Sequence, residues 1–278
     1  MNSIGVVASL LGALSFGAGD FAGAMGARRA GALVAVAAAH TIGLVALVLA
    51  VFAIRPPLPP IDAVLIGLAA GVAGVVGLAA LYRGMSIGKM GIVTSLAGCG
   101  SLVLPLIAGA VLGHAVGTLQ LVGVTSAVLA AAAAGGASRG DVERRALVLA
   151  GAAAVSFGAW YVLVDLAARA GDPLWALVTS RAGSSAIVLA VLAIRGFDAQ
   201  RIPIAILVAA GLFDVGGNAL YVVAREEIPL GLAAALVGLY PVVTVLLARF
   251  VLGEHLPRLG QVGVGLAAVG IVLISLGG

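Results

Sequence analysis

The tetrapeptide Ser-Phe-Gly-Ala at residues 15–18 occurs a second time at residues 156–159. Two further pairs follow in the same order, Ala-Leu-Tyr at 80–82 and 219–221 and Val-Leu-Gly at 111–113 and 251–253. The copies are 141, 139 and 140 residues apart. Three ordered matches at nearly one offset predict that the chain consists of two related halves.

Long apolar stretches fill both halves. A bilayer core about 30 Å thick needs about 20 apolar residues per helix. Ten spans of this kind are predicted, at about 4–26, 32–54, 60–82, 90–112, 117–135, 145–168, 173–194, 203–224, 229–252 and 257–277. Each half then has five helices. Because five is odd, the second half should enter the membrane from the opposite side, an inverted repeat of the kind found in secondary transporters.

The polar breaks between the spans are short, among them Ala27–Ala30 and Arg83–Lys89. We expect residues 1–135 to form the first five-helix repeat, 136–145 a connecting loop, and 146–278 the second repeat, around a central cavity. No break is long enough to hold a soluble domain. The helices themselves should therefore carry the function.

The composition is that of a membrane protein. Of the 278 residues, 63% are hydrophobic and 9% are charged, whereas a soluble domain has roughly 25% charged residues. This excludes a soluble enzyme, a disordered chain and a disulfide scaffold. The net charge of +4 is spread thinly, which argues against a nucleic-acid partner. We expect a multi-pass protein of the cell (inner) membrane, a monomer or homodimer, with the lipid bilayer as its surroundings.

Loop charge predicts an orientation, since cytoplasmic loops are enriched in Lys and Arg. The side that holds both termini carries Arg55, Arg169 and Arg225. The opposite side carries ten of the thirteen loop cations. The positive-inside rule therefore places both termini outside the cytoplasm.

One stretch near the C-terminus resembles a known family. Residues 240–257 read Tyr-Pro-Val-Val-Thr-Val-Leu-Leu-Ala-Arg-Phe-Val-Leu-Gly-Glu-His-Leu-Pro and precede a Gly-rich last helix. This is similar to the C-terminal signature of EamA-type permeases of the drug/metabolite transporter superfamily. A weaker copy runs from Pro105 to Gly113, with His114 where the acid of the Gly-Glu pair would stand, and residues 14–23 also resemble first helices of this family.

The resemblance implies ten helices, a central cavity and export of small metabolites such as amino acids. It also implies cytoplasmic termini, opposite to the loop charge, so the orientation stays open at this point. The resemblance does not identify a substrate.

Several polar residues lie inside the predicted spans, where an ionisable group costs about 2.5–3.5 kcal/mol and usually faces a cavity or a partner. Asp214, Asn218 and Tyr221 share one helical face of the eighth span. Either this face lines a transport pathway or it joins helices in a buried network. Arg181, in the seventh span, is the expected partner of Asp214, as a structural clamp or as a group that opens to bind a substrate carboxylate.

Two further candidates lie in the first half. His40 is the repeat counterpart of Arg181 and serves either in packing or as a proton relay. Asp20 lies among glycines, from Gly17 to Gly23, which permit close helix approach or local unwinding. Asp214, Asp20 or His40 would carry any proton coupling.

Interrupted helices at matching repeat positions mark the site of many transporters. Gly98–Ser101, with Pro105, interrupts the fourth span, and Gly238–Pro241 interrupts the ninth. A proline kink for packing is the alternative. The remaining candidates are aromatic residues that would wall a cavity for a flat or apolar solute: Trp160, Tyr161, Tyr82, Tyr221 and Tyr240.

Other motifs give little chemistry. The single cysteine, Cys99, excludes a multi-cysteine metal site. The sequence contains no P-loop and no His-Glu-x-x-His, so we expect no cofactor, no metal and no direct use of ATP. Glu254 is interpreted mainly as a cap on the tenth helix. Gly67-x-x-x-Gly71 would pair helices within the chain or between chains.

The leading hypothesis is a secondary transporter, a probable exporter, of a small metabolite such as an amino acid or an apolar or aromatic solute. It would work by alternating access between the inverted repeats, with proton coupling as an option. We expect no enzymatic activity. The alternatives are a membrane-embedded lipid-handling protein or enzyme, and a non-transporting scaffold.

Overall fold

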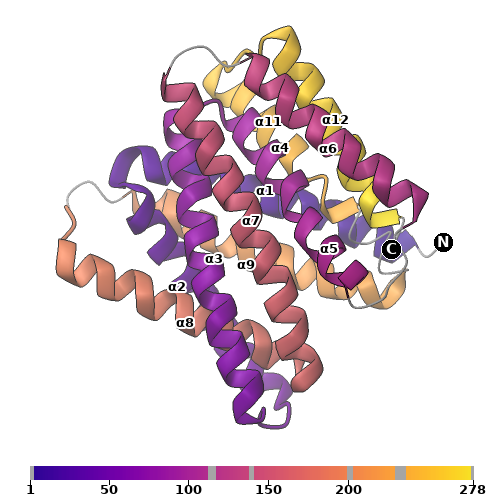
Figure 1. The fold of residues 1–278 in the computed structure, drawn as a ribbon. Helices are drawn as coiled ribbons and strands as arrows, with labels where there is room; N and C mark the ends of the chain where they lie inside the picture. Colours follow the sequence, from indigo (N-terminus) through magenta and orange to yellow (C-terminus); the bar gives the residue numbers. More distant parts are fainter. Residues whose placement is uncertain (1–2, 112–116, 138–140, 199–202, 229–235, 277–278) are drawn as a thin grey trace.

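The computed structural model describes residues 3–111, 117–137, 141–198, 203–228 and 236–276 (Figure 1). Within these residues every regular element is a helix. The helices are α1 Ser3–Ala30, α2 Ala32–Ile54, α3 Ile61–Ile87, α4 Met90–Ser101, α5 Val103–Val111, α6 Thr118–Ala137, α7 Asp141–Ala170, α8 Pro173–Arg195, α9 Ile204–Glu227, α11 Tyr240–Leu252 and α12 Arg258–Leu276.

Several of these helices are long enough to span a membrane. Six of the described helices, α1, α2, α3, α7, α8 and α9, are long and apolar enough to cross a membrane. The shorter apolar helices fall in the predicted fourth, fifth, ninth and tenth spans. The prediction of an all-helical, multi-pass membrane protein is confirmed.

Two predicted breaks were wrong. α1 continues through Ala27–Ala30, and only Gly31 separates it from α2. α3 likewise continues past Arg83 to Ile87. The hydropathy pattern marks the segment that fits the apolar core of the bilayer. The helix itself can continue beyond that core as long as its backbone hydrogen bonds are made. The chain turns at Gly31 with φ of 91°, a conformation that costs glycine little.

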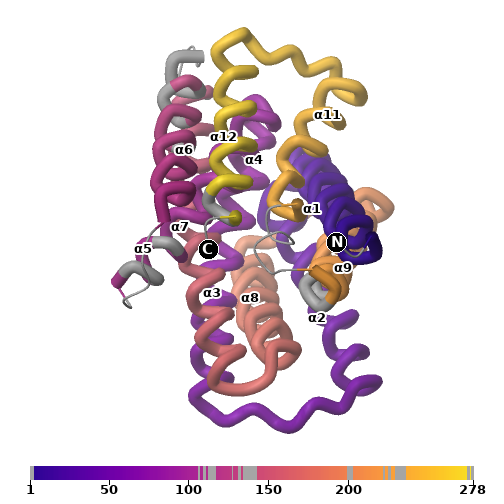
Figure 2. Tube along the Cα trace, turned by 90° about the vertical axis from the view of Figure 1, so that its right-hand side faces the viewer, coloured from indigo at the N-terminus to yellow at the C-terminus, as the bar shows by residue number. Residues whose placement is uncertain are grey.

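The helices pack mainly against partners from the other half of the chain. α1 lies along α9, α3 lies along α7 and α8, and α12 lies along α6. The pair of α6 and α12 runs side by side at one edge of the molecule in both views (Figures 1 and 2). The two halves are therefore intertwined and do not form separate bundles.

Small side chains fill the spaces between helices, and large apolar side chains point outward. Ala24, Ala35 and Ala39 are completely buried, whereas Phe52 and Ile194 are 71% and 85% exposed. Lipid tails are as apolar as leucine, so helices in a bilayer associate through close packing of small residues. The exposed apolar surface is thus the expected lipid-facing surface.

The Gly67-x-x-x-Gly71 motif pairs helices within the chain. A side chain at Gly67 would overlap Thr179 of α8, and one at Gly71 would overlap the backbone around Ser180 and Ser184. The two glycines therefore let α3 and α8 approach at backbone distance.

Candidate functional site

An ion pair joins α8 and α9 near the middle of both helices. Arg181 Nη2 donates to Asp214 Oδ2 at 2.6 Å, and the two side chains are 13% and 21% exposed. The predicted pairing of these residues is confirmed. Gly43 of α2 lies beside the Arg181 side chain, since a methyl group at Gly43 would lie 3.7 Å from Arg181 Nε. A methyl group there would make only ordinary van der Waals contact, so α2 packs against the ion pair without a steric need for glycine.

Asn218 and Tyr221 follow Asp214 on α9 and bond or pack locally. The Asn218 side chain donates from Nδ2 to the carbonyl oxygen of Asp214 at 2.8 Å. Tyr221 is half-buried and packs against a small apolar cluster with Ala8 of α1. In this conformation Asn218 bonds to the backbone of its own helix through Nδ2 rather than to the Asp214 carboxylate.

Asp20 of α1 lies between two glycines that bring α1 close to its neighbours. A methyl group at Gly19 would lie 3.3 Å from the backbone nitrogen of Asp214, and a side chain at Gly23 would overlap the ring of Tyr82. Gly19 thus brings the part of α1 that carries Asp20 against the part of α9 that carries Asp214. Close helix approach therefore places a second acid beside the ion pair.

His40 and Tyr82 are buried, at 3% and 2% exposure. Within the described part of the chain, His40 Nδ1 has no hydrogen-bond partner, and the ring lies within electrostatic range of Arg181. The Tyr82 hydroxyl group reaches α1 at Gly23, three residues after Asp20. That these residues form one binding site stays a prediction.

The aromatic candidates divide into packed and accessible rings. Trp160 Nε1 donates to Ser180 Oγ at 2.9 Å, and the indole fills the space beside Gly74. Tyr161 is 44% exposed and meets Trp160 edge to face, with ring centroids 5.2 Å apart. Tyr161 thus has a free face, whereas Trp160 holds α7 against α3 and α8.

The two predicted helix interruptions lie against each other. A turn at Leu102 separates α4 from α5, and a turn at 238–239 precedes α11. A methyl group at Gly98 would lie 2.9 Å from the hydroxyl oxygen of Tyr240 and 3.0 Å from Pro241 Cγ. Tyr240 also contacts Phe16, with centroids 6.3 Å apart. The breaks therefore meet at the centre of the fold, next to α1.

Hydroxyl groups that sequence reasoning missed hold α1 against the second half. Ser15 Oγ donates to the carbonyl oxygen of Phe213 at 2.7 Å, and Thr244 Oγ1 donates to that of Gly17 at 3.1 Å. The repeated Ser-Phe-Gly motif was the available signal, because a serine within an apolar span needs a partner.

Glu254 has a different role from the predicted one. Its Oε2 accepts a hydrogen bond from the backbone N–H of Met90 at 3.2 Å, so it caps α4 in the other half and not the last helix. Sequence proximity suggested the helix that follows, whereas the fold brings the start of α4 to the same place. Met90 N–H is otherwise free because it lies in the first turn of its helix.

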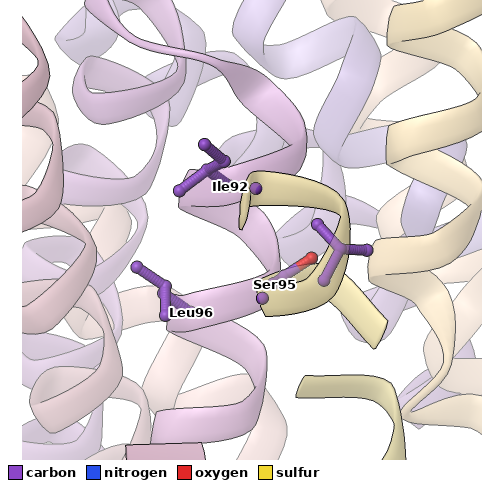
Figure 3. Close-up of a pocket in the computed structure, with 6 residues that line it drawn as sticks. Ile92, Ser95 and Leu96 are labelled. Carbon is purple, nitrogen blue, oxygen red and sulfur yellow. The ribbon is translucent and has the colours of Figure 1, made fainter. Parts of the chain in front are cut away.

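A crevice between α4 and α12 is lined in part by the hydroxyl group of Ser95 (Figure 3). Its lining residues are Ile92, Ser95, Leu96, Gly260, Gly263 and Val264. Ser95 Oγ has no hydrogen-bond partner within the described residues. The crevice has no room for a water molecule, so it is a packing gap and not a ligand site.

Comparisons with known proteins agree with this fold. Residues 144–276 match the model of the EamA-like transporter family. A solved structure titled only as the crystal structure of a protein has a TM-score of 0.64 and 16% identity, covering 98% of this chain and 96% of that one. At this identity the likeness concerns the fold alone. No curated protein matches the sequence.

Proposed function

We propose that this multi-pass membrane protein is a secondary transporter of a small solute, an exporter working by alternating access, since residues 144–276 match the model of the EamA-like transporter family. The family consists of transporters of small solutes. The observation that carries the proposal is the part-buried Arg181–Asp214 pair, with Asp20 on the adjoining helix α1. Charges at this depth are retained where they face a substrate or ion pathway.

Alternating access requires two halves that exchange roles, and the packing of the helices supports an inverted repeat. In the repeat, α1, α3 and α4 correspond to α7, α9 and α11. The contact of α3 with α7 then corresponds to that of α9 with α1, and the contact of α4 with α7 to that of α11 with α1; all four contacts exist. Three further pairs join a helix to its own counterpart in the other half, and all three are in contact: α2–α8, α4–α11 and α6–α12. Such self-paired contacts are what a two-fold axis between residues 1–135 and 146–278 produces.

Individual residues follow the same exchange. The ring of Phe16 lies where a side chain of Gly217 would be, with 2.8 Å between ring and ideal Cβ. The ring of Phe157 occupies the equivalent place at Gly77, with 2.7 Å. Phe157 and Gly217 lie 141 and 140 residues after Phe16 and Gly77. One helix contact is therefore built twice, once from each half.

A second contact repeats in the same way. A methyl group at Gly17 would lie 2.7 Å from the carbonyl oxygen of Tyr240, and one at Gly158 would lie 3.0 Å from that of Ser101. Gly17 and Gly158 are the glycines of the two Ser-Phe-Gly-Ala copies. Tyr240 and Ser101 lie at the two helix interruptions. Both interruptions thus contact the opposite half through a glycine of the repeated motif.

The side chains of the two halves differ near the Arg181–Asp214 pair. Trp160 corresponds to Gly19, and Gly74 corresponds to Asp214, at offsets of 141 and 140. On one side the indole of Trp160 fills the space beside Gly74, whereas on the other Gly19 faces the backbone of Asp214. This asymmetry gives one half of the centre a bulky packed ring and the other a charged side chain.

Transport by purified protein in proteoliposomes tests the proposal. Vesicles are loaded with a mixture of amino acids and small aromatic amines and acids, and efflux of each is followed by mass spectrometry. We expect saturable, selective efflux that Asp214→Asn abolishes or uncouples at unchanged insertion. Asp165→Asn is the matched control, because Asp165 is exposed and paired only with Arg169. Efflux no faster than from protein-free vesicles, for every solute, would contradict the proposal. Efflux by Asp214→Asn at the wild-type rate would remove this residue from the mechanism.

A further inference from the structure

Helices α3 and α7 run side by side in opposite directions (Figure 1). A methyl group at Gly77 would lie 3.2 Å from Ser156 Cβ, and one at Gly84 would lie 3.3 Å from Leu149 Cβ. The residue number on α7 therefore falls as that on α3 rises. Beside these contacts, Val76 is 50% exposed, so the pair has an outer face that meets lipid.

Two arginines lie at one end of this outer face. Arg83 precedes Gly84, and Arg145 precedes Ala146, whose carbonyl oxygen a methyl group at Gly84 would approach to 3.5 Å. One residue back along a helix is a turn of about 100°. In an antiparallel pair, the same turn away from the contact leads to the same face of both helices. Both arginines are exposed.

Helix length places both arginines at one surface of the bilayer. Arg83 follows Ile61, the 72% exposed first residue of α3, by 22 residues, which is about 33 Å of helix. Arg145 precedes the exposed Asp165 of α7 by 20 residues, which is about 30 Å. The apolar core of a bilayer is about 30 Å thick. Each helix thus crosses it once between these residues.

Apolar residues lead from the arginines toward the middle of the bilayer. Val76 and Arg83 are seven residues apart on α3, and Arg145 and Ala152 are seven residues apart on α7. Residues seven apart lie on one side of a helix, about 10 Å from each other along its axis. Ala152 is exposed, and its small side chain leaves space beside α3. The outer face therefore offers an apolar strip that ends in two positive charges.

These two charges are available to a ligand. Within the described residues, neither Arg83 nor Arg145 forms an ion pair. Glu143 lies two residues before Arg145 and is therefore on the other side of α7. Helices in contact are about 8–10 Å apart, a separation that two arginine side chains can bridge through one phosphate group.

The opposite end of the outer face has no free positive charge in the described part of the chain. There α3 begins as α7 ends, since a methyl group at Gly171 would lie 3.2 Å from Ala63 Cβ. Asp62 is exposed at this end, and Arg169 is bonded to Asp165 at 2.7 Å. An anion in the lipid is thus attracted to one end of the pair only.

We propose that the outer face of α3 and α7 binds an anionic phospholipid, with the phosphate between Arg83 and Arg145 and an acyl chain along Val76 and Ala152. Guanidinium groups bind phosphate through two parallel hydrogen bonds. An arginine near the membrane surface strengthens the binding of an anionic lipid about fivefold. The inference does not depend on transport and assigns this face a partner in the bilayer.

Two lipids with the same chains test the charge requirement. Native mass spectrometry of the full-length protein in a non-ionic detergent counts bound dioleoyl phosphatidylglycerol, an anion, and dioleoyl phosphatidylcholine, a zwitterion. We expect phosphatidylglycerol to bind at least about tenfold more tightly. Glycerol phosphate at the same concentration should not displace it, because it has no acyl chain. Equal binding of the two lipids, or displacement by glycerol phosphate, overturns the inference.

Charge variants assign the binding to these arginines. Arg83→Gln with Arg145→Gln should weaken phosphatidylglycerol binding about 25-fold and leave phosphatidylcholine binding unchanged. The matched control is Arg195→Gln with Arg258→Gln, which removes the same charge from exposed residues of α8 and α12. All four arginines are exposed, so thermal melting without added lipid should match the wild type. Unchanged affinity in the first variant, or an equal loss in the control, refutes the site.

A third variant tests the apolar part and leaves both charges in place. Ala152→Trp fills the space beside α3 and should weaken phosphatidylglycerol binding several-fold. Ala190→Trp, at an exposed position of α8, should not. Equal affinities of these two variants would show that no acyl chain lies along α3 and α7, which overturns the proposed position of the lipid.

Discussion

Glu254 and Met90 are joined by a hydrogen bond across 164 residues of sequence, from the backbone N–H of Met90 to Glu254 Oε2 at 3.2 Å. The carboxylate also lies at the positive end of the α4 dipole. Glu254→Ala should therefore lower stability by about 1 kcal/mol, with Glu254→Gln in between. Thermal melting in detergent measures the change. His255→Ala is the control, because this neighbour is exposed, and an equal loss in both variants would show that the cap contributes nothing.

The ion pair predicts a non-additive effect. Arg181→Ala leaves the part-buried Asp214 carboxylate without its partner, so we expect a loss of up to about 3 kcal/mol. The double change Arg181→Ala with Asp214→Asn removes both charges and should be more stable than the single one. Both proteins are compared by thermal melting at matched expression. Equal stability of the single and double variants would mean that the pair does not hold α8 to α9.

Two glycines predict opposite responses to the same substitution. Gly71→Ala forces a methyl group onto the α8 backbone near Ser180 and should destabilise by about 1–3 kcal/mol. Gly151→Ala meets no atom within 4 Å and should stabilise α7 by about 0.5–1 kcal/mol. Circular dichroism during heating distinguishes the two. Similar midpoints for both variants would show that the α3–α8 contact tolerates a side chain.

Loop charge predicts that the stretch around Ser138 faces the cytoplasm. With Cys99 replaced by Ala, Ser138→Cys should resist a membrane-impermeant thiol reagent applied to intact cells and react after permeabilisation. A cysteine at Leu58, which is 83% exposed between α2 and α3, should show the reverse. Reaction at position 138 in intact cells would support the orientation that the family resemblance implies.

Much of the fold could be predicted because the bilayer simplifies the problem. Apolar length alone placed α2 at its observed bounds, 32–54, and the repeated tripeptides and tetrapeptide indicated two halves. The helix ends were less predictable, since α1 and α3 continue as helices beyond the apolar core. The positions of Gly31 and Leu102 follow from backbone turns, which hydropathy does not measure.

The candidate site was predictable where its residues were conspicuous in an apolar span. The pairing of Arg181 with Asp214 could be predicted because a charge inside an apolar span needs a partner, and this rule requires no structure. The partner of Glu254 could not be found in this way, since a backbone N–H has no sequence signature. Nor could the sequence show that Tyr82 is packed against Gly23 while Tyr161 keeps an exposed face.

The bond between Arg181 and Asp214 also has a consequence for biosynthesis. α8 and α9 are consecutive, and each carries one charged residue near its middle, which costs about 2.5–3.5 kcal/mol in lipid when the helix enters alone. If α8 and α9 leave the translocon together as a hairpin, the two charges neutralise each other. We therefore expect α8 to enter the lipid only after α9 has been synthesised. In a glycosylation-mapping assay, a nascent chain ending after Arg195 should therefore insert α8 less completely than one ending after Glu227. Residues 173–227 would then be a single unit of insertion, in which the order of synthesis and the order of membrane entry differ.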